Sequence, residues 1–112
     1  MQRVQIGEFE ELVLLITAIL KGEAYGISVM DEIEKQTGRK VNISAVHTAL
    51  DRLDKKGFLQ SVVGGATAAR GGRRKRYFEV TNLGIQAIEI NRKLRNALYD
   101  QIPSVVLDLN KS

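Results

Sequence analysis

Residues 42–63 read NISAVHTALDRLDKKGFLQSVV, and their first half has the periodicity of an amphipathic helix. Its apolar residues are spaced three, four and three apart, at Ile43, Val46, Leu50 and Leu53. Asn42 or Ser44 can cap the start of this helix, which is expected to run to Lys56 before Gly57. The second half, rich in β-branched and aromatic residues from position 58, predicts a strand.

The opposite face of the predicted helix carries Ser44, His47, Thr48, Asp51, Arg52 and Lys55. Near its N-terminal end this face is small, polar and uncharged, which suits close approach to a base edge or a phosphate. His47 is either a polar residue on that face or a pH-sensitive group, since histidine changes charge near neutrality. Asp51 and Arg52 are interpreted as a surface pair, with Arg52 able to reach a phosphate and Asp51 expected to hold either Arg52 or a neighbouring chain in place.

C-terminal to the helix, Phe58–Val63 and Tyr77–Val80 predict two strands of a hairpin. Between them, Arg70–Arg76 holds five basic residues in seven positions. The whole chain has 17 Lys and Arg against 13 Asp and Glu, so without these five the balance is 12 against 13. Charge concentrated in this way indicates a surface that binds a polyanion.

Three further helices are predicted on either side. Glu8–Leu20 begins with acidic residues and is apolar on nearly every side later. It is expected to be buried either between its domain and something else, such as a second copy of the chain, or at the centre of its own domain. A helix over about Gly26–Thr37 ends at Gly38. Thr81 caps a long helix from Asn82 to near Gln101, followed by a tail that is either a short helix or a strand. The long helix carries a repeat typical of helix–helix packing at Leu83, Ala87, Ile90, Leu94 and Ala97.

The composition argues against several classes of protein. With 112 residues the chain is expected to form one domain. It has no cysteine and only one histidine, and no acidic cluster has ligand spacing, so no metal site, cofactor or enzymatic activity is predicted. The longest apolar run, Leu12–Leu20, is too short to cross a bilayer, and the N-terminus lacks a signal-peptide pattern. We therefore expect a cytoplasmic protein with no membrane partner.

The order of elements predicts a mainly α fold with a small β-hairpin, arranged as a winged helix-turn-helix domain plus a C-terminal dimerisation helix. The DNA-binding domain would span residues 1–81, with its wing at about 58–80. Residues 82–112 would form the dimerisation helix and tail. In this fold the third helix enters the major groove and the hairpin contacts flanking backbone.

Several segments, in this order, closely resemble the PadR family of bacterial transcriptional regulators. They are GEFE at 7–10, LVLL at 12–15, AYG at 24–26, SAVHTALDRL at 44–53 and RGGRRKRY at 70–77. The resemblance implies a dimeric winged-helix repressor that binds double-stranded DNA. In some members a small aromatic or drug-like ligand releases the protein from DNA. The family usually has tyrosine where His47 stands, and its best-known drug-binding members use a tryptophan, which this chain lacks.

Together, the residues and the resemblance assign DNA contacts to Tyr25, Lys40, Ser44, His47, Thr48, Arg52, Arg70, Arg73, Arg74, Lys75 and Arg76. A homodimer interface is expected at Phe9, Leu12, Leu15, Ile16, Ala87, Ile90, Leu94, Ala97 and Leu98. Phe9 and Tyr99 are candidates to line the cavity of a small hydrophobic effector. The alternative is an interaction module whose basic loop binds an acidic protein or RNA, although the outer face of the third helix offers no aromatic or aliphatic anchor.

Overall fold

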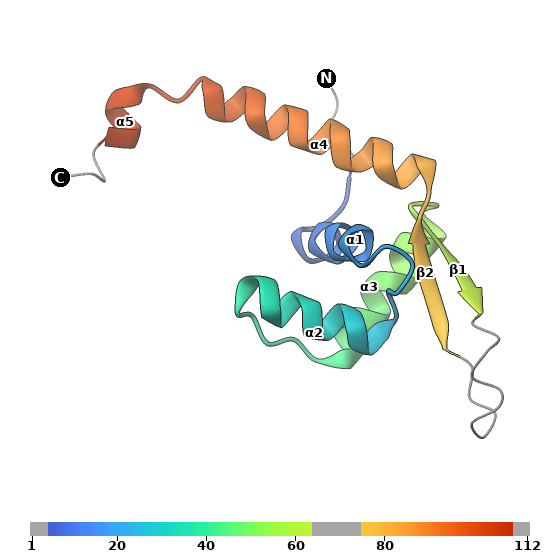
Figure 1. The fold of residues 1–112 in the computed structure, drawn as a ribbon. Coiled ribbons are helices and arrows are strands. Elements are labelled where there is room, and N and C mark those ends of the chain that lie inside the picture. Colours follow the sequence, from blue (N-terminus) through green and yellow to red (C-terminus); the bar gives the residue numbers. More distant parts are fainter. Residues whose placement is uncertain (1–4, 64–74, 109–112) are drawn as a thin grey trace.

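The computed structural model of the protein describes residues 5–63 and 75–108, in which three helices precede a two-stranded antiparallel hairpin and two helices follow it (Figure 1). In chain order the elements are α1 (Glu8–Leu20), α2 (Gly26–Thr37), α3 (Ile43–Lys55), β1 (Leu59–Val63), β2 (Arg76–Val80), α4 (Asn82–Asp100) and α5 (Ser104–Asp108). This confirms the predicted mainly α fold with a small hairpin. The described part of the tail, for which the sequence left helix and strand open, forms the short helix α5.

Three of the helix ends are determined by the residues that cap them. Gly38 ends α2 in the left-handed region at φ 73°, a conformation that favours glycine. Asn42 is the cap of α3, because its side-chain oxygen accepts a hydrogen bond from the Ala45 amide at 2.8 Å. Thr81 caps α4 in the same way, accepting from the Gly84 amide at 3.1 Å.

The hairpin joins the helices through its second strand. β1 and β2 pair in antiparallel register, with Leu59 opposite Val80. The segment between α1 and α2 adds an isolated bridge to β2, in which the Phe78 amide donates to the Ala24 carbonyl at 2.8 Å. The β2 strand is therefore held on both sides, by β1 and by the chain entering α2.

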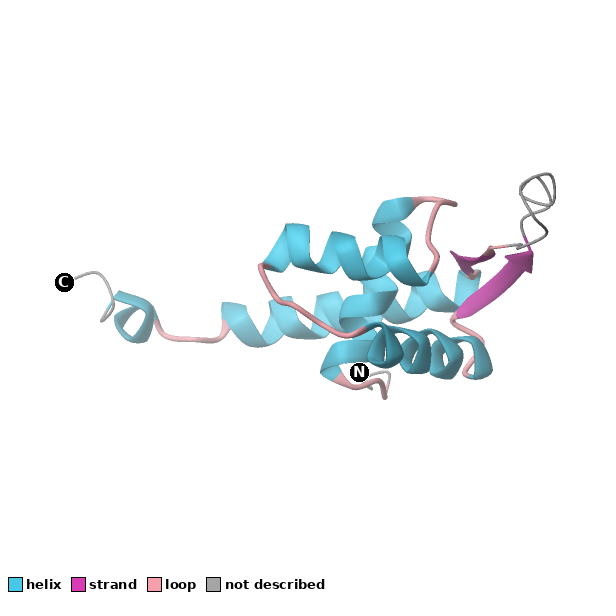
Figure 2. Ribbon diagram, turned by 90° about the horizontal axis from the view of Figure 1, so that it is seen from below, coloured by secondary structure: helices cyan, strands magenta, loops and turns pink. Residues whose placement is uncertain are grey.

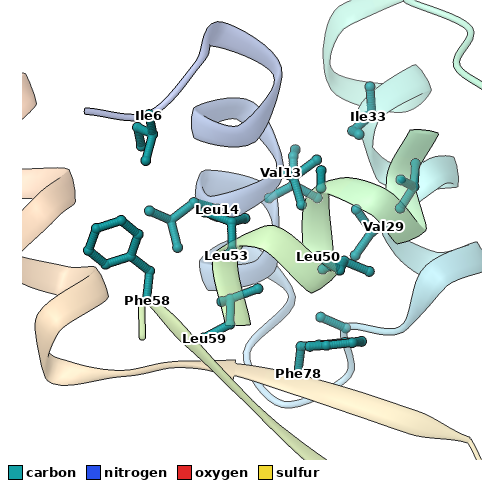
Figure 3. Close-up of a cluster of buried hydrophobic side chains, with 14 of the residues drawn as sticks. Ile6, Val13, Leu14, Val29, Ile33, Leu50, Leu53, Phe58, Leu59 and Phe78 are labelled. Atoms are coloured by element: carbon teal, nitrogen blue, oxygen red, sulfur yellow. The ribbon is translucent and has the colours of Figure 1, made fainter. Parts of the chain in front are cut away.

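The core fills the space enclosed by the first three helices and the inner end of the hairpin (Figure 3). The apolar stripe predicted for α3 points into it, since Val46, Leu50 and Leu53 have no exposed surface. Its other main members are Val13, Leu14, Val29, Ile33, Phe58, Leu59 and Phe78. Burial of this one face of α3 leaves its other face to solvent.

The acidic first turn of α1 is tied to three other parts of the chain. Each of its carboxylates forms an ion pair, in addition to the favourable position of negative charge at a helix N-terminus. The pairs are Glu8 with Arg39 at 2.9 Å, Glu10 with Lys56 at 2.7 Å and Glu11 with Arg95 at 3.4 Å.

Helix α4 is anchored at its start and projects away at its end. A side chain at Gly84 would place a Cβ 2.3 Å from the Phe58 carbonyl oxygen, so only glycine permits this approach. All the buried residues of α4 lie in its first half, whereas Leu98 and Tyr99 are 57% and 58% exposed. Figure 2 shows α4 and α5 extending beyond the helical body.

This projection makes the molecule elongated. Its extents are 60 × 32 × 20 Å and its radius of gyration is 17.1 Å, against about 13 Å for a compact domain of this length. No helix among residues 5–63 and 75–108 is both long enough and apolar enough to cross a membrane.

Candidate nucleic-acid interface

The outer face of α3 consists of the six polar and charged residues that lie opposite its buried stripe. All six are exposed, as the periodicity predicts: Ser44, His47, Thr48, Asp51, Arg52 and Lys55. The N-terminal half of this face offers hydroxyl and imidazole groups, which both donate and accept hydrogen bonds. The C-terminal half carries charge.

His47 lies directly against the start of α2. A Cβ at Gly26 would fall 2.5 Å from the imidazole Cε1 and 2.9 Å from Nε2. Glycine at position 26 therefore lets α3 bring its histidine up to the backbone of α2. The two helices of the turn thus meet at a point where one side chain, His47, is both packed and exposed.

Beside this contact lies the wing root, which we define as Tyr25, Lys75, Arg76 and Tyr77. The Lys75 ammonium sits 4.2 Å from the centre of the Tyr25 ring, a distance typical of a cation–π contact. The Tyr25 and Tyr77 rings meet edge to face, with their centres 5.6 Å apart. The aromatic contacts thereby hold Lys75, the residue just before β2, over the N-terminus of α2.

A shallow hollow of about 270 Å³ joins the wing root to the outer face of α3. It is lined by Tyr25, Gly26, Ile27, Ile43, His47, Lys75, Arg76 and Phe78. Residues from three separate parts of the sequence meet here, and four of them were expected to contact the same ligand: Tyr25, His47, Lys75 and Arg76. The structure brings these four expected site residues together.

The Arg76 side chain contacts other residues of the domain. One guanidinium nitrogen donates to Asp51 at 3.1 Å and another to Asp54 at 3.0 Å, while the group lies 4.8 Å from the centre of the Phe78 ring. The predicted pair between Asp51 and Arg52 is therefore wrong. Asp51 binds a cation from β2, because the hairpin returns beside the C-terminal half of α3.

Two other expected contacts are exposed at the edges of this surface. Arg52 keeps 65% of its side chain exposed, although its guanidinium lies 3.7 Å from a Glu10 carboxylate. Lys40 is exposed in the turn before α3. The expected contacts Arg70, Arg73 and Arg74 lie outside the described residues.

The residues assigned to a dimer interface divide into two groups. Ile16 and Ala87 are 2% and 1% exposed, so they belong to the core of the single chain and offer no surface to a partner. The sequence misassigned them because an apolar helix face looks the same whichever chain covers it. The others are half-buried or exposed: Phe9, Leu12, Leu15, Ile90, Leu94, Ala97 and Leu98.

A groove of about 520 Å³ runs between α1 and α4, lined by Glu8, Glu11, Leu12, Leu15, Ile88, Arg92, Arg95 and Asn96. The expected cavity residues Phe9 and Tyr99 are not in its lining. Phe9 instead borders a pocket against α3 and lies under the Arg39 guanidinium. Near the groove, the hydrogen bond from Arg92 lowers the pKa of Glu89 and raises that of Arg92.

Asp54, which was not among the expected site residues, completes the site around Arg76. Its signal was its spacing: Asp51 and Asp54 are three residues apart and share a helix face, where two carboxylates need a cation between them. Within the described part of the chain, no group of three or more His, Cys, Asp or Glu side chains could hold a metal ion.

The sequence and the fold are both similar to those of known transcriptional regulators. Residues 15–90 match the Transcriptional regulator PadR-like family. No curated protein matches the sequence. Among solved structures, a PadR-like transcriptional regulator from Bacillus cereus is 17% identical with a TM-score of 0.67, covering 93% of this chain and 92% of that one. A PadR family transcription regulator from Clostridium difficile is 20% identical with a TM-score of 0.62, covering 80% and 91%.

Bacillus subtilis PadR, solved in complex with operator DNA, is 17% identical with a TM-score of 0.64, covering 76% of this chain and 46% of that one. At these identities the structural likeness establishes the fold, and it confirms the winged helix. The family match spans more than half of the residues and confirms the resemblance seen in the sequence motifs. The chain therefore belongs to the PadR-like family of transcriptional regulators, which are regulators and not enzymes.

Proposed function

We propose that this protein is a sequence-specific DNA-binding repressor that acts as a homodimer. The observation that carries the proposal is the hollow shared by His47 of α3 and Lys75 of the wing root. It shows a polar helix face and a cation of the wing on one side of the molecule. A winged helix bound to DNA needs this arrangement, with the helix in the major groove and the hairpin on flanking backbone.

Base reading is assigned to the N-terminal half of the outer face of α3. Ser44 and Thr48 are exposed and carry hydroxyls that can donate to or accept from base edges. Tyr25, Lys40, His47, Arg52 and Lys75 surround them with groups suited to phosphate. The DNA-bound relative from Bacillus subtilis supports double-stranded DNA as the partner.

The dimer is proposed from the exposed apolar residues in the second half of α4. With residues 1–81 as the DNA-binding domain and 82–112 as the dimerisation segment, a second chain would cover Leu94, Ala97 and Leu98, and Leu15 on α1. Two copies of α3 would then meet successive major grooves about 34 Å apart. The operator is accordingly expected to be an inverted repeat.

The groove between α1 and α4 is the proposed binding site for a small hydrophobic effector. Leu12, Leu15 and Ile88 supply its apolar wall, and Arg92 and Arg95 supply cations at its edge. A flat aromatic molecule bound there would contact both the DNA-binding domain and the dimerisation helix. We propose that such a ligand releases the protein from DNA by changing the angle between them.

Capture of genomic DNA fragments by the purified protein tests the proposal. We expect a few fragments to be enriched, sharing an inverted repeat, and transcription from their promoters in vitro to fall when the protein is added. Enrichment without a shared motif would contradict sequence-specific binding. A sedimentation measurement on the same sample should give a dimer, and a monomer bound to a single half-site would contradict the proposed assembly.

Salt dependence checks the role of the basic run. The double variant Arg73→Ala, Arg74→Ala should bind all sequences more weakly and flatten the dependence of log affinity on log salt by about two contacts. The matched control Lys35→Ala removes an exposed cation on α2 and should leave the slope unchanged. A double variant with the wild-type slope would contradict the phosphate-clamp role of the wing.

A further inference from the structure

Arg76 differs from its neighbour Lys75 in how its charge is used. Its two terminal nitrogens donate to Asp51 and Asp54 of α3 at 3.1 and 3.0 Å. Its guanidinium also lies 4.8 Å from the centre of the Phe78 ring, and Phe78 is buried in the core. Two donor groups and one face of the guanidinium are thus committed within the domain.

The two carboxylates need this cation. Asp51 and Asp54 are one turn apart on α3, so their like charges face each other on the same side of the helix. Arg76 reaches them across 25 and 22 residues of sequence and neutralises part of that repulsion. The planar guanidinium suits the task, because its forked donors can satisfy two acceptors at once, which a single ammonium does less well.

The local charge argues against a phosphate on Arg76. One guanidinium and two carboxylates leave a net negative charge, so a phosphate approaching Arg76 would also meet the two like charges that lie 3.1 and 3.0 Å from the guanidinium. Lys75 lies on an aromatic ring and forms no ion pair with the described residues. Adjacent basic residues of the wing therefore have different surroundings.

We propose that Arg76 is a positioning residue, which fixes the wing against α3 through Asp51 and Asp54 and thereby sets the specificity of DNA reading. The proposal rests on the proposed function, because it assigns Arg76 to geometry and Lys75 to phosphate. A helix in the major groove and a hairpin on the backbone must be held at one separation for both to engage. The link between β2 and α3 supplies that separation.

The first test compares Arg76→Ala with Lys75→Ala in the full chain, on operator and unrelated DNA over a range of salt. Lys75→Ala should flatten the salt slope by about one and keep the ratio of specific to nonspecific affinity. Arg76→Ala should keep the slope and lower that ratio about tenfold. A slope lowered by about one in Arg76→Ala, with the ratio unchanged, would overturn the proposal and make Arg76 a phosphate contact.

The double variant Asp51→Asn, Asp54→Asn distinguishes the effect of wing position from the effect of the two carboxylate charges on DNA affinity. It removes two negative charges from the DNA-facing helix, so nonspecific affinity should rise, whereas Arg76→Ala should lower it. Both variants break the same link, so both should lower the ratio of specific to nonspecific affinity. If the double variant raised specific and nonspecific affinity equally, the carboxylates would act through charge alone and the link would have no role.

Hydrogen exchange of the free protein tests the link without DNA. The amides of Val62 and Tyr77, which lie opposite each other in the register, are at the strand ends nearest Arg76. We expect their exchange to rise about fivefold in Arg76→Ala, to rise similarly in Asp51→Asn, Asp54→Asn, and to rise no further when all three changes are combined. Arg76→Lys should rescue only in part. Additive effects, or unchanged exchange, would overturn the link even if DNA binding is confirmed, and absence of DNA binding with these exchange results would overturn only the proposed function.

Discussion

Helices α3 and α4 are both amphipathic, but only in α3 is the apolar face covered by its own chain along most of its length. In α3, Val46, Leu50 and Leu53 have no exposed surface. In α4 the deeply buried residues end at Asn91, and Leu98 beyond it is 57% exposed. The same kind of sequence pattern therefore produces a completed packing surface in one helix and an open one in the other.

The covered face of α3 and the exposed end of α4 therefore have different roles. Because the core holds α3 rigidly, its outer face can present fixed hydrogen-bonding groups to a ligand. The exposed end of α4 presents an apolar surface, which only a second molecule can cover. Stability of the single chain and assembly of two chains should therefore respond to different substitutions.

The largest effect should come from Leu50→Ala. Loss of a fully buried leucine leaves a cavity, so the free energy of unfolding should fall by about 2 to 5 kcal/mol. Chemical denaturation measures it. The loss should be the same at every protein concentration, and a loss below about 1 kcal/mol would contradict the completed packing of α3.

Leu98→Ala should act on assembly. Both copies of a symmetric dimer would lose part of a buried leucine side chain, so the free energy of dimerisation should weaken by about 2 to 3 kcal/mol. Sedimentation equilibrium measures the dissociation constant. Gln86→Ala, at an exposed polar position of the same helix, is the matched control. If Leu98→Ala lowered stability equally at all concentrations, Leu98 would belong to the fold of the single chain.

Much of the fold could be predicted because its decisive signals are local. Asn42 and Thr81 mark helix starts, Gly38 marks a helix end, and the exposed and buried faces of α3 follow from a period of 3.6 residues. The family motifs rest on the same local residues. Helix and strand ends consequently agree with expectation to within about one residue.

The errors concern contacts made across long distances in the sequence. The partner of Asp51 is Arg76, 25 residues away, and only the return of the hairpin beside α3 brings them together. Ile16 and Ala87 are apolar on helices expected to dimerise, but they face the core of their own chain. Periodicity identifies an apolar face without saying which molecule covers it.

Ser44→Ala should separate recognition from stability on α3. Its hydroxyl lies on the exposed face, so the free energy of unfolding should change by less than about 0.5 kcal/mol. Preference at one base-pair position should change by about 1 to 2 kcal/mol, as measured by selection from randomised operators. The control Ser61→Ala removes an exposed hydroxyl from β1 and should leave the preference unchanged. Equal profiles for the two variants would contradict base reading by Ser44.

The smallest effects should come from the two helix caps. Asn42→Ala removes one exposed cap bond from α3 and should cost about 1 kcal/mol of unfolding free energy. Thr81→Ala should cost more, because its hydroxyl also donates to the Gly57 carbonyl at 2.6 Å and so joins α4 to the turn after α3. Thr81→Ser keeps that hydroxyl and should retain most of the stability.

The caps also differ in what lies beyond them. Asn42 begins a helix that the core holds in place, whereas Thr81 sets the direction of a helix whose far end projects from the body. A small change of angle at Thr81 is amplified along the 19 residues of α4, so Thr81→Ala should also weaken dimerisation, and Asn42→Ala should not. Sedimentation equilibrium of both variants measures their dissociation constants and so tests this difference. Equal dimerisation in the two would show that packing against α1, and not the cap, sets the direction of α4.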